Sequence, residues 1–103
     1  MIHGNLIMIK LLLDKRADVN AQNREYKSPL HLACEFHGPE VVGELGRAEN
    51  AFIMAEDIHR NTPLHYAAKQ GRLDNVKLLI EELGSSVEVM NDKNLMPVDL
   101  TQN

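Results

Sequence analysis

Apolar residues along this chain gather in short stretches of helical spacing, and each stretch gives way to a polar segment. The apolar stretches cover residues 6–13, 41–45 and 73–83. The polar segments that follow them end near Asn23, Asp57 and Asn91. This alternation predicts short helices separated by long polar loops, repeated several times along the chain.

A second set of short helices is marked by a repeated motif. The segment SPLHLAC at residues 28–34 returns as TPLHYAA at residues 62–68, and a weaker copy, MPVDL, occupies residues 96–100. Its prolines, at positions 29, 63 and 97, are 34 residues apart. A serine or threonine supplies an N-cap oxygen, and proline suits the first helical position, where its missing N–H has no partner to lose. The motif therefore predicts a helix start at each proline.

Small apolar residues recur within the motif at positions i, i+3 and i+4. They form a narrow stripe on each helix, made of Leu30, Ala33 and Cys34 in one copy and of Leu64, Ala67 and Ala68 in the next. Small side chains let neighbouring helices approach closely. The longer helix predicted after Gly71 is apolar around much of its girth, so we expect both of its sides to be covered by stacked repeats.

The motif and its period resemble the ankyrin repeat family, whose unit of about 33 residues carries a T-P-L-H-x-A signature. The resemblance implies an all-α solenoid of stacked helix-turn-helix units with β-hairpin loops. It divides the single domain into a partial first repeat (1–23), a second (24–56), a third (57–90) and a truncated fourth (91–103). It also implies that His31 and His65 are structural and brace neighbouring turns.

Several positions depart from the family pattern. Arg16 replaces a loop glycine, and the hairpin-turn glycine is replaced in each repeat by Tyr26, Arg60 and Asn94. A tyrosine or arginine in a left-handed conformation costs on the order of 1 kcal/mol, whereas asparagine tolerates it better. Gly43 and Gly46 predict a short or distorted second helix in the second repeat. One extra residue near Leu83 predicts a slightly longer loop.

The N-terminal edge is a further departure, because the helix predicted at residues 6–13 is apolar on nearly all faces. Repeat arrays usually end in polar-faced capping repeats. We expect this edge to be covered by further repeats of a longer array or by a second copy of the chain. The alternative is that the edge frays and its apolar face stays in water.

Composition excludes several classes of function. The chain carries 11 basic and 15 acidic residues with both signs interspersed, so it offers no basic stripe for nucleic acid. No apolar run approaches the roughly 20 residues that span a bilayer. A single cysteine excludes an internal disulfide and suits a reducing compartment, which predicts an intracellular protein, cytoplasmic or nuclear.

Candidate catalytic and metal-binding residues have a simpler explanation. His31 and Cys34 share a helix face, but the equivalent His65 is followed three residues later by Ala68, so the histidine belongs to the scaffold. The five histidines match no zinc spacing. We therefore expect no catalysis, no metal and no cofactor.

The resemblance places a protein or peptide partner in a concave groove lined by hairpin tips and first helices. We expect Phe36 and Tyr66 to be exposed anchors of this protein–protein interaction, because aromatic residues are favoured at hot spots. The alternative for Phe36 is that it fills space in the irregular second repeat. The complete set of expected partner-binding residues is Arg24, Glu25, Lys27, Leu32, Glu35, Phe36, Ile58, His59, Asn61, Tyr66, Lys69, Gln70, Asp92, Lys93 and Leu95.

Two further interpretations stay open at the level of sequence. The repeats could instead be a structural spacer or regulatory segment of a longer ankyrin-repeat scaffold. The loop at residues 12–20 resembles ankyrin loops that are substrates of an asparaginyl hydroxylase, which makes Asn20 a candidate for hydroxylation. The alternative is that the Asn20 side chain stabilises its loop through hydrogen bonds to the backbone.

Overall fold

The computed structural model describes residues 20–48 and 50–101. The helix predicted at residues 6–13, the loop position Arg16 and the N-terminal edge lie outside the described residues.

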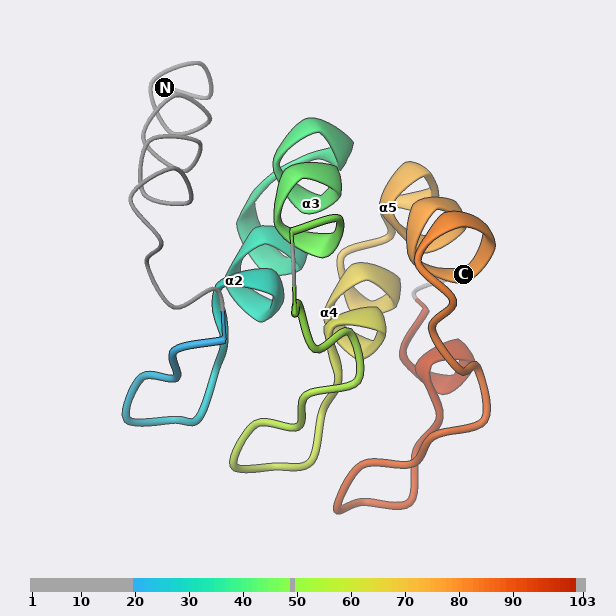
Figure 1. Cartoon of the computed structure of the whole chain (residues 1–103). Coiled ribbons are helices and arrows are strands. Elements are labelled where there is room, and N and C mark those ends of the chain that lie inside the picture. Colours follow the sequence, from blue (N-terminus) through green and yellow to red (C-terminus); the bar gives the residue numbers. More distant parts are fainter. Residues whose placement is uncertain (1–19, 49, 102–103) are drawn as a thin grey trace.

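The helices form two rows, with the loops projecting together from one side (Figure 1). The first row contains α2 (Pro29–Phe36), α4 (Pro63–Lys69) and the 3₁₀ helix η2 (Pro97–Leu100). The second row contains α3 (Pro39–Gly46) and α5 (Leu73–Lys77), which continues into the π-helix η1 (Leu78–Glu82). The all-α solenoid is confirmed, and stacking within each row gives the chain its repeat architecture.

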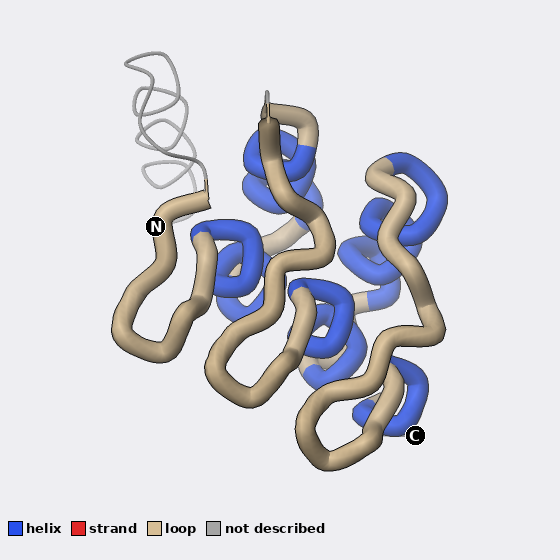
Figure 2. Tube along the Cα trace, turned by 60° about the horizontal axis from the view of Figure 1, so that its bottom comes forward, coloured by secondary structure: helices blue, strands red, loops and turns tan. Residues whose placement is uncertain are grey.

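The loops lie side by side in one layer and point in the same direction (Figure 2). Residues 20–48 and 50–101 contain no β-strand, so the expected β-hairpins are present only as tight turns. Each turn is closed by a backbone bond such as Asn23 N–H to the carbonyl of Lys27, at 3.1 Å. Each turn contains two backbone hydrogen bonds of this kind, which are too few to form a regular pair of strands.

Every first-row helix begins at the predicted proline. At α2, Ser28 has an extended backbone and its Oγ accepts a 3.4 Å hydrogen bond from the N–H of His31. In return, the Nδ1 atom of His31 accepts a 3.0 Å bond from the N–H of Ser28. This reciprocal capping box satisfies two backbone donors that a helix start leaves free.

The predicted stripe of small apolar residues forms the centre of the core. Ala33, Cys34 and Ala67 have exposed fractions of 1% or less, and they pack with Val41 and Leu79 from the second row. Burial raises the pKa of the Cys34 thiol to about 12. Cys34 is therefore a small apolar residue of the core and supplies no thiolate at neutral pH.

The continuous helix formed by α5 and η1 buries only part of its apolar surface. Leu78 and Leu79 are buried, but Leu73 and Ile80 are exposed. The expectation that this helix is covered on both sides is therefore wrong for these two positions among the described residues.

Helix α3 is short, as predicted, but it is a regular α-helix of eight residues. A Cβ atom on Gly46 would overlap the side chain of Leu83, and one on Gly43 would meet the guanidinium group of Arg47. Gly46 therefore lets the Leu83 side chain lie against α3, and neither glycine distorts the helix.

The extra residue near Leu83 is accommodated within the helix. The N–H of Leu83 donates to the carbonyl of Leu78, five residues earlier, at 3.1 Å. A π-turn holds one residue more than an α-turn. The loop that follows covers residues 83–96, and a length above that of a standard repeat stays a prediction.

The loop turns are built on one repeated asparagine or aspartate. The Oδ1 atoms of Asn23, Asp57 and Asn91 each accept bonds from the N–H groups two and four residues later, at 2.8 to 3.1 Å. Such Asx turns fix the loop without a strand. The residue before the last of these donors has a left-handed backbone in every copy, with φ between 61° and 66° at Tyr26, Arg60 and Asn94.

The two histidines of the motif connect neighbouring units. The Nε2 atom of His31 lies 2.7 Å from the carbonyl oxygen of Asn61, and that of His65 lies 2.9 Å from the carbonyl oxygen of Leu95. Because Nδ1 of His31 accepts from Ser28, its proton must sit on Nε2, which donates to Asn61. The bracing role implied for these histidines is confirmed.

We predict that Tyr26→Gly stabilises the chain. Tyr26 has a φ of 62° and an exposed side chain, so glycine relieves backbone strain and removes little packing. The free energy of unfolding should rise by about 0.5 to 1 kcal/mol, measured by urea denaturation followed by circular dichroism. Tyr26→Ala is the matched control, because alanine shortens the side chain and keeps the strain. Equal stability of the two variants would contradict the prediction.

We also predict that His31 makes stability depend on pH. Burial lowers the pKa of His31 below its ordinary value of 6.5, although the carbonyl of Asn61 opposes this shift. As the pH falls below about 6.5, the unfolded chain binds the proton first, so the free energy of unfolding decreases by up to about 1.4 kcal/mol per pH unit. The decrease ends below the folded-state pKa.

Urea denaturation at pH 7.5 and pH 5.5 tests this prediction. The loss of stability between the two pH values should be smaller in His31→Gln than in the wild-type chain. Glutamine keeps an acceptor for the capping box and has no proton to gain in this range. The same loss in both proteins would assign the pH dependence to other groups.

Candidate functional site

A groove with a volume of about 500 Å³ lies between the projecting loops and the first-row helices. The loops, α2, α4 and η2 all contribute to its walls. Its lining residues are Lys27, Glu35, His59, Asn61, His65, Tyr66, Lys69, Asn91, Asp92, Lys93, Leu95, Asp99 and Leu100.

The groove brings together most of the residues predicted to bind a partner. Those that line it are Lys27, Glu35, His59, Asn61, Tyr66, Lys69, Asp92, Lys93 and Leu95. The other predicted residues, Arg24, Glu25, Leu32, Phe36, Ile58 and Gln70, are not part of its lining. Phe36 and Ile58 are nevertheless strongly exposed, with 67% and 53% of their surfaces in solvent.

Tyr66 is not the exposed anchor that the sequence analysis expects. Only 7% of its surface is accessible, and it belongs to the hydrophobic core. Its hydroxyl donates a short hydrogen bond to the Asp57 carboxylate, and its ring meets the His31 ring edge-on at a centroid distance of 5.6 Å. Tyr66 therefore supports the floor of the groove and is unavailable as a hot spot.

Asp57 is the hydrogen-bond partner of the buried Tyr66 hydroxyl. This aspartate is buried, and one of its oxygens is occupied by the Asx turn described above. The other oxygen receives the Tyr66 hydroxyl, so a buried charge is compensated by three donors. Burial first, and then the Asp57 carboxylate, raise the pKa of Tyr66, which stays a neutral donor at neutral pH.

Lys27 lies over the same tyrosine from the loop that precedes α2. Its Nζ atom lies 5.0 Å from the centre of the Tyr66 ring, 3.1 Å from Glu35 and 3.5 Å from Glu25. Partial burial works against the charge, but the attraction of Glu35 and Glu25 outweighs it and raises the pKa of Lys27. This charge is therefore balanced within the groove wall.

Backbone hydrogen bonds hold the loops at a fixed spacing. The N–H of Ile58 donates to the carbonyl of Glu25 at 2.8 Å, and the N–H of Asp92 donates to the carbonyl of His59 at 2.9 Å. The Asn91 side chain adds a 2.8 Å bond to Asn61 Oδ1. Hydrogen bonds within the chain therefore fix the positions of the loops that form this wall.

The sequence analysis missed four lining residues, namely His65, Asn91, Asp99 and Leu100. The 34-residue period could have identified Asp99, because this residue occupies the position equivalent to His31 and His65. Its carboxylate accepts a 2.9 Å bond from the N–H of Met96, the capping role of the histidines. The same period aligns Asn91 with Asn23 and Asp57.

The histidine of α2 has no free ring nitrogen, and the cysteine of α2 has no exposed thiol. Both ring nitrogens of His31 are engaged, by Ser28 and by the carbonyl of Asn61, and Cys34 is a buried thiol. In the described part of the chain, no group of histidine, cysteine, aspartate or glutamate side chains could hold a metal ion.

Asn20 uses its side-chain amide to tie two loops together. Its Nδ2 donates to the carbonyl of Asn50 at 2.7 Å, and its Oδ1 accepts from the N–H of Phe52 at 2.9 Å. These bonds are the loop-stabilising role weighed in the sequence analysis. Hydroxylation of Asn20 stays a prediction.

Stacked helix pairs with a fixed period, joined by histidine and loop hydrogen bonds, define a solenoid repeat protein. The family model for ankyrin repeats, written as three copies, matches residues 1–91. The chain belongs to the ankyrin repeat family. Ankyrin repeats are in general protein–protein interaction modules, and the fold itself is non-catalytic.

The chain is similar to segments of much longer proteins. It is 31% identical to a Danio rerio protein named as the palmitoyltransferase ZDHHC13, and the match covers 99% of this chain and 16% of that protein. It is 36% identical to an Arabidopsis thaliana protein named as the E3 ubiquitin-protein ligase XBAT35, and the match covers 97% of this chain and 22% of that protein. The nuclear factor NF-kappa-B p105 subunit of Gallus gallus matches at 31% identity over 97% of this chain and 11% of that protein.

The chain spans less than a quarter of the length of these curated relatives. No helix within residues 20–48 and 50–101 is long and apolar enough to cross a membrane.

We predict that the Tyr66 hydroxyl stabilises the fold through Asp57. Tyr66→Phe leaves a buried carboxylate without one donor, so the free energy of unfolding should fall by about 1 to 3 kcal/mol. A double-mutant cycle with Asp57→Asn isolates the pair, since asparagine already serves at the equivalent positions 23 and 91.

Urea denaturation of the four proteins in this cycle gives the interaction energy. The exposed Tyr26→Phe is the matched control and should leave stability unchanged. Additive effects of Tyr66→Phe and Asp57→Asn would show that the two side chains do not interact.

Proposed function

We propose that this chain is a protein-binding module that receives a protein or peptide in the groove between its loops and first-row helices. The observation that carries the proposal is the convergence of predicted partner-binding residues from three loops and two helices around this one groove. No single repeat could form it, because its walls come from neighbouring units.

Fixed walls support this proposal energetically. The Asx turns, the histidine bonds and the Tyr66–Asp57 pair hold the loops and helices through contacts that no partner needs to supply. A partner therefore binds without ordering the groove, and less conformational entropy is lost on association.

The proposed surface combines polar and apolar groups. Lysine, histidine and acidic side chains line the groove, while Phe36 and Ile58 add exposed apolar surface on α2 and on the loop between α3 and α4. Aromatic and aliphatic anchors within a polar rim are typical of protein interfaces. Phe36 is the anchor that we retain from the sequence analysis.

Peptide selection with the 103-residue chain tests the proposed function. Twelve-residue peptides selected from a random display library would be titrated into ¹⁵N-labelled protein and followed by nuclear magnetic resonance. We expect the amide signals of groove-lining residues to shift. Phe36→Ala combined with His59→Ala should weaken binding about tenfold, because both side chains are exposed and available to a partner.

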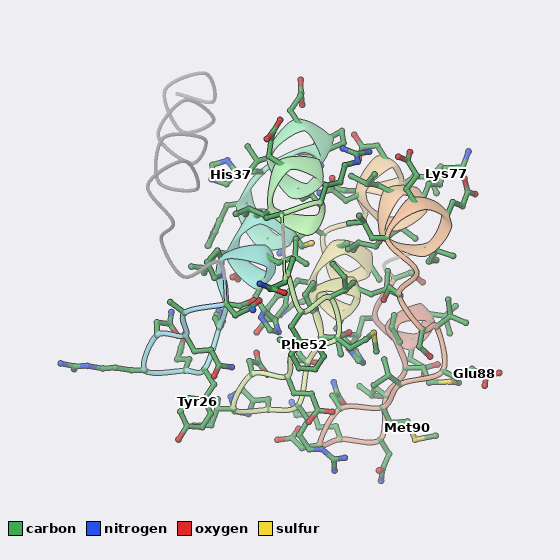
Figure 3. The ribbon with its side chains drawn as sticks, in the orientation of Figure 1. Tyr26, His37, Phe52, Lys77, Glu88 and Met90 are labelled. Carbon is green, nitrogen blue, oxygen red and sulfur yellow. The ribbon has the colours of Figure 1, made fainter. Side chains whose placement is uncertain are left out.

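The matched control substitutes two exposed residues of α5, Leu73→Ala and Lys77→Ala. Figure 3 shows Lys77 on the helical side of the molecule, away from the loops. The control should bind selected peptides like the wild-type chain. Signal shifts centred on α5, or equal weakening by both double variants, would contradict binding in the groove.

A further inference from the structure

We propose that a second pocket of this chain, separate from the groove, receives an arginine side chain of a partner protein. The pocket has a volume of about 450 Å³ and shares no described lining residue with the groove. It lies between the loop that precedes α2 and the loop between α3 and α4. We name it the loop pocket, and its described lining residues are Asn20, Gln22, Phe52, Met54, Ala55 and Glu56.

Side-chain amides join the two walls of the loop pocket. Asn20 Nδ2 donates to the carbonyl of Asn50 at 2.7 Å, and Asn20 Oδ1 accepts from the N–H of Phe52 at 2.9 Å. Gln22 Nε2 donates at 2.8 Å to a carbonyl of its own loop and at 3.5 Å to the carbonyl of Glu56. Because the walls are connected within the chain, an entering side chain does not have to order them.

These hydrogen bonds leave acceptors available in the loop pocket and use up its side-chain donors. The amide nitrogens of Asn20 and Gln22 are both engaged, whereas Gln22 Oε1 has no hydrogen-bond partner among the described residues. The exposed Glu56 carboxylate adds two further acceptor oxygens. No lysine or arginine is among the described lining residues. The loop pocket therefore suits a positively charged group that carries several donors.

Phe52 adds an aromatic face to these acceptors. Its side chain is exposed, with 58% of its surface in solvent, while its backbone N–H is held by Asn20. A guanidinium group stacks on aromatic rings and donates two parallel hydrogen bonds to a carboxylate. The ammonium of lysine is more strongly hydrated and lacks this planar pair of donors. Arginine therefore fits the loop pocket better than lysine does.

A single arginine side chain can use both the apolar and the polar lining. Its methylene stem packs on apolar surface while its charged head stays among polar groups. Met54 and Ala55 provide apolar surface for the stem, and Phe52 and Glu56 provide the ring and the carboxylate for the head.

Arg60 is the cation that already contacts the Glu56 carboxylate. Its Nε atom lies 3.9 Å from Glu56 Oε1, and both side chains are exposed. Exposed ion pairs of this kind contribute little free energy. Since Arg60 is not part of the lining, an entering guanidinium can replace this contact with closer, paired hydrogen bonds.

Nuclear magnetic resonance titration of the ¹⁵N-labelled 103-residue chain tests the proposal. The probe is Nα-acetyl-arginine amide, compared with the corresponding amides of citrulline and lysine at constant ionic strength. Citrulline keeps the shape of arginine without its charge, and lysine keeps the charge without the planar group. We expect the arginine probe to shift the signals of residues 52–56 saturably and to bind at least about threefold more tightly than either comparison compound.

Substitutions then locate the interaction. Phe52→Ala and Glu56→Gln should each weaken binding of the arginine probe at least about threefold, because each removes one contact with the guanidinium. Arg60→Gln should strengthen binding about twofold, since it removes the competing cation. Glu88→Gln is the matched control for Glu56→Gln. It removes an exposed carboxylate from the loop that follows η1, outside the loop pocket, and should leave binding unchanged (Figure 3).

Three results would overturn the proposal. They are equal binding of the arginine and citrulline probes, signal shifts confined to groove-lining residues, and equal weakening by Glu56→Gln and Glu88→Gln. Each variant is compared only after its spectrum shows a folded chain, and Phe52→Leu replaces Phe52→Ala if the alanine variant does not fold. Peptide binding in the groove is tested independently, because the two sites share no described lining residue. Either proposal can therefore fail while the other stands.

Discussion

The structure depends on one arrangement, a buried histidine that closes its own helix start and then reaches the next unit. The first-row helices α2, α4 and η2 have eight, seven and four residues, and helices of this length are not stable alone in water. His31 satisfies the N–H of Ser28 with one ring nitrogen and the carbonyl of Asn61 with the other. Local helix formation and stacking of repeats are therefore coupled, because the tautomer that caps the helix is also the one that donates to the neighbour.

That coupling also explains why the groove has firm walls. Each histidine bond ends on a carbonyl at the base of the next loop, and the loop itself is fixed by the Asx turn at Asn23, Asp57 or Asn91. Tyr66 adds a connection from α4 to Asp57 in the same wall. The groove is thus a consequence of how the repeats are held together, and its lining residues are free to vary where they do not serve this scaffold.

Much of the scaffold was predictable from sequence because its signals are local or periodic. A proline after serine or threonine predicts a helix start, and small apolar residues at helical spacing predict the core. The burial of Tyr66 was not predictable from its own helix, because it depends on Asp57 and Lys27 in two separate loops. The close contact of Leu83 with Gly46 was likewise not predictable from α3 alone, because Leu83 follows Gly46 by more than thirty residues in sequence.

The periodic comparison of repeats is nevertheless where structure and sequence say most about specificity. Positions that carry hydrogen bonds keep their chemistry from one unit to the next, as the asparagines and aspartate of the loop turns do. Positions that face the groove change sign, as Glu35 and Lys69 do, or lose charge, as Lys27 and Asn61 do. Since all four line the same groove, the charge of this surface changes along its length although its backbone repeats. For the proposed binding in the groove, specificity would therefore come from side chains that break the repeat on a hydrogen-bonded scaffold that preserves it.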